Sequence, residues 1–278
     1  MSNISNKGNE AFPMQIIKYR WENFQPMLVV NNGSIGKIRL FDADLKFSVG
    51  AKRCIGSFVK GVYQPCPSNT EIRSGYYCDG CRLSDDFFLC VQCDGSECIN
   101  RKRRSKCEEE NYFIYLAAFD SLLKVGISLD RRITERLVEQ GAEFGAKVAS
   151  VKVGKTVRVV EQRIKMELRI ADRILGEEKY ARLFCDPNKA AIQLYKTIVR
   201  LRSLIPEYMI YPEIFDMRGY YKLQHVITKP RHTEVAEGMK LDGKVVAAKG
   251  NIIILENDSG FAAINAHRLI GRDVEMMQ

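Results

Sequence analysis

The stretch NYFIYLAAFDSLLKVGISLDRRITERLVEQGA, residues 111–142, contains in order the pattern of a strand, a tight turn, a second strand and a helix. Its apolar runs predict strands over 111–119 and 121–127, with the turn at AFDS. A helix is expected from about Asp130 to Gln140, with Gly141 as its C-cap. A strand that runs through a glycine into a basic helix is an arrangement that suits phosphate binding.

The residues that follow extend this pattern into an α/β domain. KVASVKVG (147–154) alternates and predicts a third strand. Residues 156–175 carry apolar side chains at helical spacing, which predicts a helix with one buried stripe. Asp186 and Pro187 then form a cap and first-turn pair for a further helix through about Arg202. The apolar stripe consists of Val157, Val160, Ile164, Leu168, Ala171 and Leu175.

Short β patterns flank this domain on both sides. Before it, MLVV (27–30), KIRLF (37–41) and LKFSVG (45–50) are separated by turn residues and indicate β-hairpins. After it, residues 240–269 form a series of short strand patterns broken by DG, KGN and NDSG turns.

The expected fold class is therefore α+β, with an α/β domain between β regions. We expect the flanking regions to be small β-barrels or hairpins. The predicted division is an N-terminal β region at 1–53, a cysteine-rich segment at 54–110, the α/β domain at 111–205 and a C-terminal β region at 206–278.

Composition points to a globular chain with an acidic partner. The 278 residues are 46% hydrophobic, which is enough for a core, and carry a net charge of +9. A basic balance favours nucleic acid ahead of an anionic membrane surface. Neither a membrane-spanning apolar run nor a secretory signal is evident, so we expect a cytoplasmic protein without a membrane partner.

Cysteines are concentrated in one part of the chain, since eight of the nine lie between Cys54 and Cys107. In a cytosolic protein this favours metal thiolates over disulfides. Two C-x2-C pairs, at 78–81 and 90–93, bend thiolates toward a tetrahedral ion, and zinc is preferred to an iron–sulfur cluster. The predicted ligands are Cys54, Cys66, Cys78, Cys81, Cys90, Cys93, Cys98 and Cys107.

Eight thiolates are enough for two closed zinc sites. One partition places Cys54, Cys66, Cys78 and Cys81 in the first site and the later four in the second, and an interleaved pairing is equally compatible with the spacing. Four-thiolate sites leave no open position for water or substrate, so the metal is expected to be structural.

Clustered basic residues supply candidate phosphate contacts. One group lies inside the last cysteine interval, and Arg132 and Arg136 share a helical face on which they could clamp one phosphate. Further cations follow along the predicted helix at 156–175. The predicted nucleic-acid-binding residues are Arg101, Arg103, Arg104, Lys124, Arg132, Arg136, Lys165 and Arg169.

FIY (113–115), KVG (124–126), Arg136 and Glu161 together resemble the core of GIY-YIG nucleases. In that family, two short tyrosine-bearing strands, a helical arginine and a later helical glutamate form one site. The resemblance implies that Tyr115 belongs to the water-activating system and that Arg136 steadies the phosphate charge. It also implies that Glu161 holds one divalent metal such as Mg²⁺.

Two positions depart from the nuclease pattern. Lys124 stands where the pattern has its second tyrosine, and Phe113 replaces the first glycine. An ammonium adds positive charge beside a phosphate but is a poor activator of water. The departure at Lys124 therefore favours binding over cleavage.

The longer order of motifs is similar to a prokaryotic family known as domain of unknown function 2797. That family joins a multi-cysteine segment to a stretch containing VYLA, KVGIT and RWIDQGA, followed by a small β tail. The corresponding pieces here are GYYCDGC (75–81), CVQC (90–93), IYLA (114–117), KVGIS (124–128), ERLVEQGA (135–142) and KGNIII (249–254).

The leading hypothesis is a zinc-stabilised nucleic-acid-binding protein with a degenerate GIY-YIG-like site. The layout of a zinc segment with small β regions favours RNA over DNA. The alternatives are a metal-dependent phosphodiesterase that uses Tyr115, Arg136 and Glu161, and a zinc scaffold for protein partners.

Overall fold

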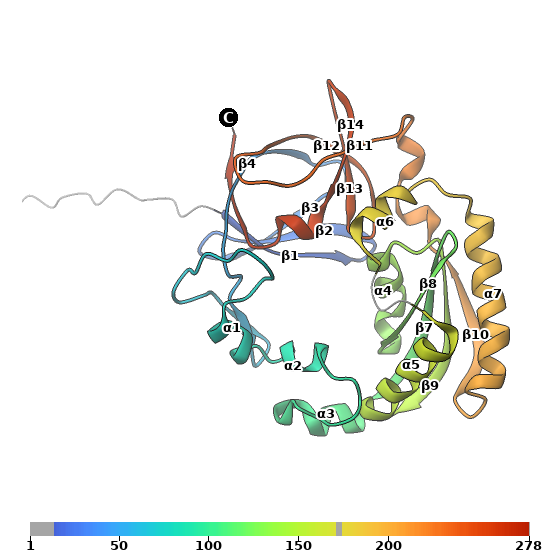
Figure 1. Cartoon of the computed structure of the whole chain (residues 1–278). Coiled ribbons are helices and arrows are strands. Elements are labelled where there is room, and N and C mark those ends of the chain that lie inside the picture. Colours follow the sequence, from blue (N-terminus) through green and yellow to red (C-terminus); the bar gives the residue numbers. More distant parts are fainter. Residues whose placement is uncertain (1–13, 171–173, 278) are drawn as a thin grey trace, which may run out of the picture.

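The computed structural model describes residues 14–170 and 174–277, which form two large β-sheets, with helix α4 (Ile133–Gln140) between them, and a separate two-stranded sheet (Figure 1). The larger sheet has nine strands and the smaller has four. This arrangement confirms the mixed α+β class expected from the sequence.

The nine-stranded sheet combines both ends of the chain. Strand β4 pairs with β12 and β15, and β1 pairs with β15, so residues near the N-terminus and the C-terminus share one sheet. Its order is β11 (Arg231–His232), β14 (Gly260–Asn265), β13 (Ile252–Asn257), β12 (Lys240–Lys249), β4 (Asp44–Lys52), β15 (Arg272–Met276), β1 (Met14–Glu22), β2 (Gln25–Asn31) and β3 (Ile35–Arg39).

This order is open, with β11 and β3 at its two edges. The expectation of small flanking β-barrels is therefore wrong for the part of the chain that the structure describes. The physical reason is the pairing of β4 with β12, which joins the two flanking hairpin groups edge to edge. Neither group closes on itself, because the other group satisfies its edge hydrogen bonds.

The four-stranded sheet is antiparallel and has β7 near its middle. Its order is β10 (Met209–Asp216), β9 (Phe144–Lys152), β7 (Asn111–Phe119) and β8 (Leu122–Ser128). Strands β7 and β8 lie where the apolar patterns predict them, whereas β9 begins three residues before the predicted strand at 147–154 and ends two residues before its end. Strand β10 follows the predicted end of the α/β domain at 205 yet pairs with β9, so this sheet extends past that boundary.

Helices cover both faces of the four-stranded sheet. Helix α4 follows the 3₁₀ turn η2 (Asp130–Arg132), packs on one face and ends at Gly141 in the left-handed conformation, as predicted. Helices α5 (Gly154–Leu168) and α7 (Pro187–Leu204) share the apolar core on the opposite face. The predicted cap of α7 is confirmed, because the Asp186 side chain accepts a hydrogen bond from Asn188 N.

Helix α5 ends earlier than the expected helix over 156–175. Arg169 adopts a left-handed φ of 53° and caps it, and Leu175 precedes the separate helix α6 (Gly176–Ala181). The predicted stripe residue Ala171 lies outside the described residues. Apolar periodicity continues past Leu168, so the stripe alone could not locate this end.

The cysteine-rich segment connects the two sheets with short elements (Figure 1). They are β5 (Ser57–Val59), β6 (Val62–Gln64), α1 (Asp79–Ser84), α2 (Phe88–Val91), η1 (Arg101–Arg103) and α3 (Arg104–Glu109). Three further 3₁₀ turns lie in the C-terminal part, namely η3 (Arg218–Tyr220), η4 (Leu223–His225) and η5 (Ala266–Leu269). Among the described helices, none is both long and apolar enough to cross a membrane.

The two sheets meet at the C-terminal end of α4. The backbones of Gly141 and Gly250 approach so closely that a Cβ on Gly250 would lie 2.9 Å from the Gln140 carbonyl carbon. The Gly250 carbonyl also accepts hydrogen bonds from Tyr19 Oη at 2.6 Å and Trp21 Nε1 at 2.8 Å. Strand β1 of the large sheet is thereby attached to the turn that touches α4.

A buried ion pair reinforces this junction. Lys249, at the end of β12, donates a hydrogen bond to Glu143, which precedes β9, and both side chains are buried. The second carboxylate oxygen of Glu143 accepts from Asp120 N at 2.7 Å. One carboxylate therefore links the large sheet to the β7–β8 turn.

Replacing Lys249 with methionine should destabilise the protein by about 3–5 kcal/mol, because it leaves the Glu143 charge buried without its partner. Chemical denaturation monitored by circular dichroism would measure the loss. The double variant Glu143→Gln/Lys249→Met should lose less, since it removes both charges and keeps an acceptor for Asp120 N. A Lys249→Met variant as stable as the wild type would contradict this role for the pair.

Candidate functional site

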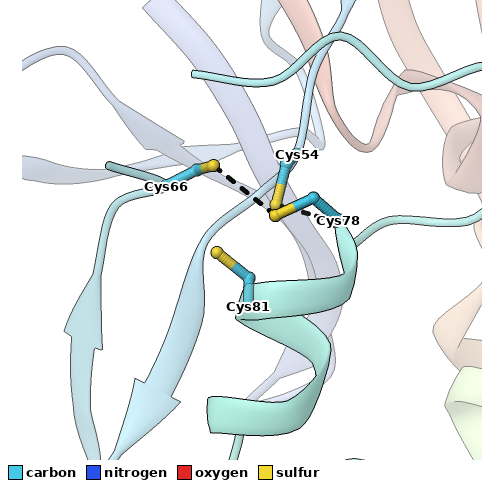
Figure 2. Close-up of side chains that lie close together, drawn as sticks. All are labelled: Cys54, Cys66, Cys78 and Cys81. Carbon is cyan, nitrogen blue, oxygen red and sulfur yellow. Dashed lines mark hydrogen bonds between the residues drawn. The ribbon is translucent and has the colours of Figure 1, made fainter. Parts of the chain in front are cut away.

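Four cysteines converge where the cysteine-rich segment leaves the large sheet (Figure 2). Cys54 follows β4, Cys66 follows the β5–β6 hairpin, and Cys78 and Cys81 belong to the start of α1. Their sulfur atoms all lie within 4.8 Å of one another. This set is the first partition that the cysteine spacing allowed, rather than an interleaved one.

The geometry of this group suits a tetrahedral metal ion. The Cys66 and Cys78 sulfurs are 3.8 Å apart. A regular tetrahedron of thiolates with Zn–S bonds of about 2.3 Å has sulfur–sulfur edges of about 3.8 Å. The four cysteines could therefore bind one ion such as zinc, and their donor set would leave no position for a substrate.

Backbone amides around the sulfurs favour thiolates at part of the site. Cys78 N donates to Cys54 Sγ at 3.2 Å. Burial raises the pKa of Cys54 and of Cys81. Burial acts in the same direction on Cys66, but amides of Thr70 and Ser68 outweigh it and lower the pKa of Cys66 to about 6. Cys66 thus offers an ionised ligand at neutral pH before any metal binds.

The later cysteines are less compactly arranged. Within 14–170 and 174–277, the only group of three or more ligand atoms this close together is the one at Cys54. Cys90 and Cys98 are nevertheless linked through Asn100. The Asn100 side-chain amide donates to Cys90 Sγ at 3.2 Å, and Cys98 Sγ donates to the Asn100 carbonyl at 3.5 Å. Cys107 is close enough to act on the pKa of Cys90. The second zinc site, with Cys93 as its fourth ligand, stays a prediction.

Tyr115, Gly126 and Arg136 come together on the α4 face of the small sheet. Tyr115 is opposite Gly126 in the β7–β8 ladder, and its ring lies across the glycine. A Cβ at Gly126 would be 2.5 Å from the Tyr115 hydroxyl, so any other residue there would displace the ring. Burial raises the pKa of Tyr115, while the charge of Arg136 and its hydrogen bond to the tyrosine oppose that rise.

Glu161 belongs to helix α5, which packs on the opposite face of the small sheet. It is 4% exposed, and its charge acts on Tyr115. Two cations of its own helix pair with it, Arg158 at 3.3 Å and Lys165 at 3.4 Å. A divalent metal at Glu161 would have to compete with both cations for the carboxylate.

Lys124 lies on the α4 face of the small sheet, as Tyr115 does, but its hydrogen-bond partner is on helix α4. Its ammonium donates to Gln140 Oε1 at 3.2 Å, near the C-terminal end of α4. Lys179 lies nearby, and burial followed by the charges of Lys124 and Lys249 lowers the pKa of Lys179 to about 7. The residue in the position of the second nuclease tyrosine therefore contributes charge to the sheet junction.

The other predicted cations have varied surroundings. Arg132 pairs with Glu135 at 3.1 Å and is half exposed. Arg103 lies 4.1 Å above the Phe87 ring, Arg104 pairs with Glu108 at 2.8 Å, and Arg101 is exposed. Arg169 does not continue a helical stripe with Lys165, because it is the left-handed cap of α5.

Lys18 and Arg20 of strand β1 join this region, and sequence reasoning missed them. Partial burial and Arg20 lower the pKa of Lys18, and Arg132 and Arg136 add to the effect. Three arginines from β1, η2 and α4 therefore act on Lys18, against an opposing effect of Glu139, and we call Lys18, Arg20, Arg132 and Arg136 the α4 basic cluster. The alternating pattern of MQIIKYRWE (14–22) puts Lys18 and Arg20 on one face, but only tertiary structure brings that strand to α4.

Comparison with known proteins identifies one match. A family model with the description "Protein of unknown function (DUF2797)" matches residues 43–274. No curated protein and no solved structure matches the chain. The matched span includes both cysteine groups, the small sheet and the C-terminal strands.

Substituting Cys78 with serine should remove about one zinc per chain, because a four-thiolate site loses one of its four ligands. The matched control is Cys185→Ser, since Cys185 lies outside both cysteine groups. Mass spectrometry of metal content would measure the difference, and thermal unfolding should show a lower midpoint for Cys78→Ser only. Unchanged zinc in Cys78→Ser, or iron in the wild type, would overturn the assignment.

Proposed function

This chain belongs to the DUF2797 family of proteins of unknown function, and we propose that it binds the phosphate backbone of a nucleic acid along α4. On this proposal, zinc holds the cysteine-rich segment in shape beside the binding face. The observation that carries the proposal is the contact of Tyr115 with Arg136, a member of the α4 basic cluster, with Glu161 close enough for its charge to act on Tyr115.

Charge on this face supports binding. The α4 basic cluster supplies four cations, of which three pair with carboxylates: Arg20 with Glu22 at 2.7 Å, Arg132 with Glu135 at 3.1 Å and Arg136 with Glu139 at 2.7 Å. Burial, and then repulsion from Arg20, lowers the pKa of Lys18, and a polyanion placed against the cluster would relieve that repulsion. Phosphate contacts of this kind release counterions and provide affinity without requiring a base sequence.

The choice between RNA and DNA needs a direct comparison. The preference for RNA rested on a zinc segment combined with a small barrel, and the described strands form an open sheet instead. RNA stays the first ligand to test, with DNA of the same sequence beside it.

A second candidate is a metal-dependent phosphodiesterase of the GIY-YIG type, favoured by the same gathering of Tyr115, Arg136 and Glu161. Three features of the site favour binding over cleavage. Burial keeps the Tyr115 hydroxyl protonated, Arg158 and Lys165 occupy Glu161, and Lys124 bonds to Gln140. The site therefore has less capacity to activate water than to hold a phosphate.

Binding to labelled RNA and DNA should weaken steeply as salt rises. Lys18→Gln and Arg132→Gln should each reduce the slope of log Kd against log salt by about 0.7–0.9, the value expected for one lost phosphate contact. Arg202→Gln is the matched control, because it removes the same charge from the exposed last turn of α7. Binding that ignores salt, or that is absent for both polymers, would contradict the proposal.

Incubation with RNA and DNA in the presence of Mg²⁺ should leave both intact if the protein only binds. Cleavage that disappears in Glu161→Gln and in Tyr115→Phe would instead support the phosphodiesterase. Gel analysis of end-labelled substrates would measure this, with a chelator as the metal control. Cleavage that persists in Glu161→Gln would show that Glu161 holds no catalytic metal.

A further inference from the structure

A cation-lined cavity lies apart from the α4 basic cluster and shares no residue with it. Its volume is about 380 Å³. Elements far apart in the sequence form its wall: the end of β4, the loop between Cys66 and Cys78, the start of α6, the turn η5 and the start of β15. Its cations are Lys52, Arg73, Arg268 and Arg272, and its carboxylates are Glu177 and Glu234.

The cations of this cavity are crowded and poorly neutralised. Among the described residues, no ion pair joins Lys52, Arg73 or Arg268 to a carboxylate, and Arg272 reaches only Glu237, at 3.7 Å. Burial lowers the pKa of Lys52, and the charges of Arg272 and Arg268 lower it further. Like charges held together in this way cost free energy that a bound anion would offset.

Two polar atoms in the cavity wall lack partners in the described structure. They are Nε of Arg272 and the hydroxyl oxygen of Thr233, both buried without a hydrogen bond. Buried polar groups are almost always paired, so two unpaired polar groups from residues that line one cavity favour a ligand that can form hydrogen bonds. The Arg272 Nη1 atom is already held by the Gly50 carbonyl at 3.1 Å, which fixes the orientation of the guanidinium.

These features specify the chemistry of the ligand. Arginine guanidinium groups present several donors in a planar fork that matches the oxygens of a phosphate. A phosphate group alone would not fill about 380 Å³, and Leu175 and Val235 provide apolar wall for the rest of a molecule. We propose that this cavity binds a phosphate monoester, carried by a mononucleotide or by the 5′ end of a nucleic acid.

Calorimetric titration of the full chain with adenosine monophosphate tests the proposal, with adenosine as the probe that lacks phosphate. Adenosine monophosphate should bind and adenosine should not. Arg268→Gln and Arg73→Gln alter exposed side chains, and each should weaken binding about tenfold through loss of one charge-assisted hydrogen bond. Arg202→Gln, in the exposed last turn of α7, is the matched control and should leave this affinity unchanged.

Oligonucleotides with a 5′-phosphate or a 5′-hydroxyl distinguish the two sources of the phosphate. A preference for the phosphorylated end that Arg268→Gln abolishes assigns the cavity to a nucleic acid end. Equal binding of the two oligonucleotides, together with binding of adenosine monophosphate, assigns it to a free nucleotide.

The proposal is overturned if the 5′-phosphate confers no advantage and adenosine monophosphate fails to bind or binds no better than adenosine. It is equally overturned if Arg268→Gln and Arg73→Gln leave every affinity unchanged. The proposed role of the α4 basic cluster is tested separately, by the salt dependence of nucleic-acid binding in Lys18→Gln and Arg132→Gln. The two proposals can therefore fail independently.

Discussion

The close contact between Gly141 and Gly250 is the constraint on which the arrangement of the two sheets depends. At this point the end of α4 meets the β12–β13 turn with no room for a side chain on either residue. The residues of the buried pair, Glu143 and Lys249, are close in sequence to Gly141 and Gly250 respectively. Because α4 packs against apolar residues of both sheets, its position sets the distance between them and the direction in which Arg136 points.

The candidate phosphate site inherits its geometry from that helix. Arg136 reaches Tyr115 because α4 lies across the small sheet, and it reaches the neighbourhood of Lys18 because the same helix borders β1. Gly126 contributes by leaving space for the tyrosine ring. A site shared between two sheets in this way can exist only after they have docked, so the proposed phosphate binding would depend on the integrity of the Glu143–Lys249 junction.

Local patterns predicted the local elements well, and long-range pairing escaped them. The strand at 111–119, the cap at Gly141 and the start of α7 at Asp186 follow from short-range chemistry. The grouping of Tyr115, Arg136 and Glu161 into one site came from a family resemblance and stays a prediction. By contrast, the sequence of β4 contains no local signal that its partners are β12 and β15, because strand pairing and register are decided by packing across the whole sheet. The expected barrel and the omission of Lys18 both come from that limit.

The placement of β4 between β12 and β15 also has a consequence for synthesis of the chain. Both edges of β4 stay unpaired until residues 240–276 leave the ribosome, which at about 5–20 residues per second takes on the order of 10–40 s after β4 appears. The small sheet and α4 are complete well before then. We therefore expect the small sheet with α4 to act as a template on which the N-terminal and C-terminal strands of the large sheet pair. The nascent chain should be most prone to aggregation during the interval before they pair.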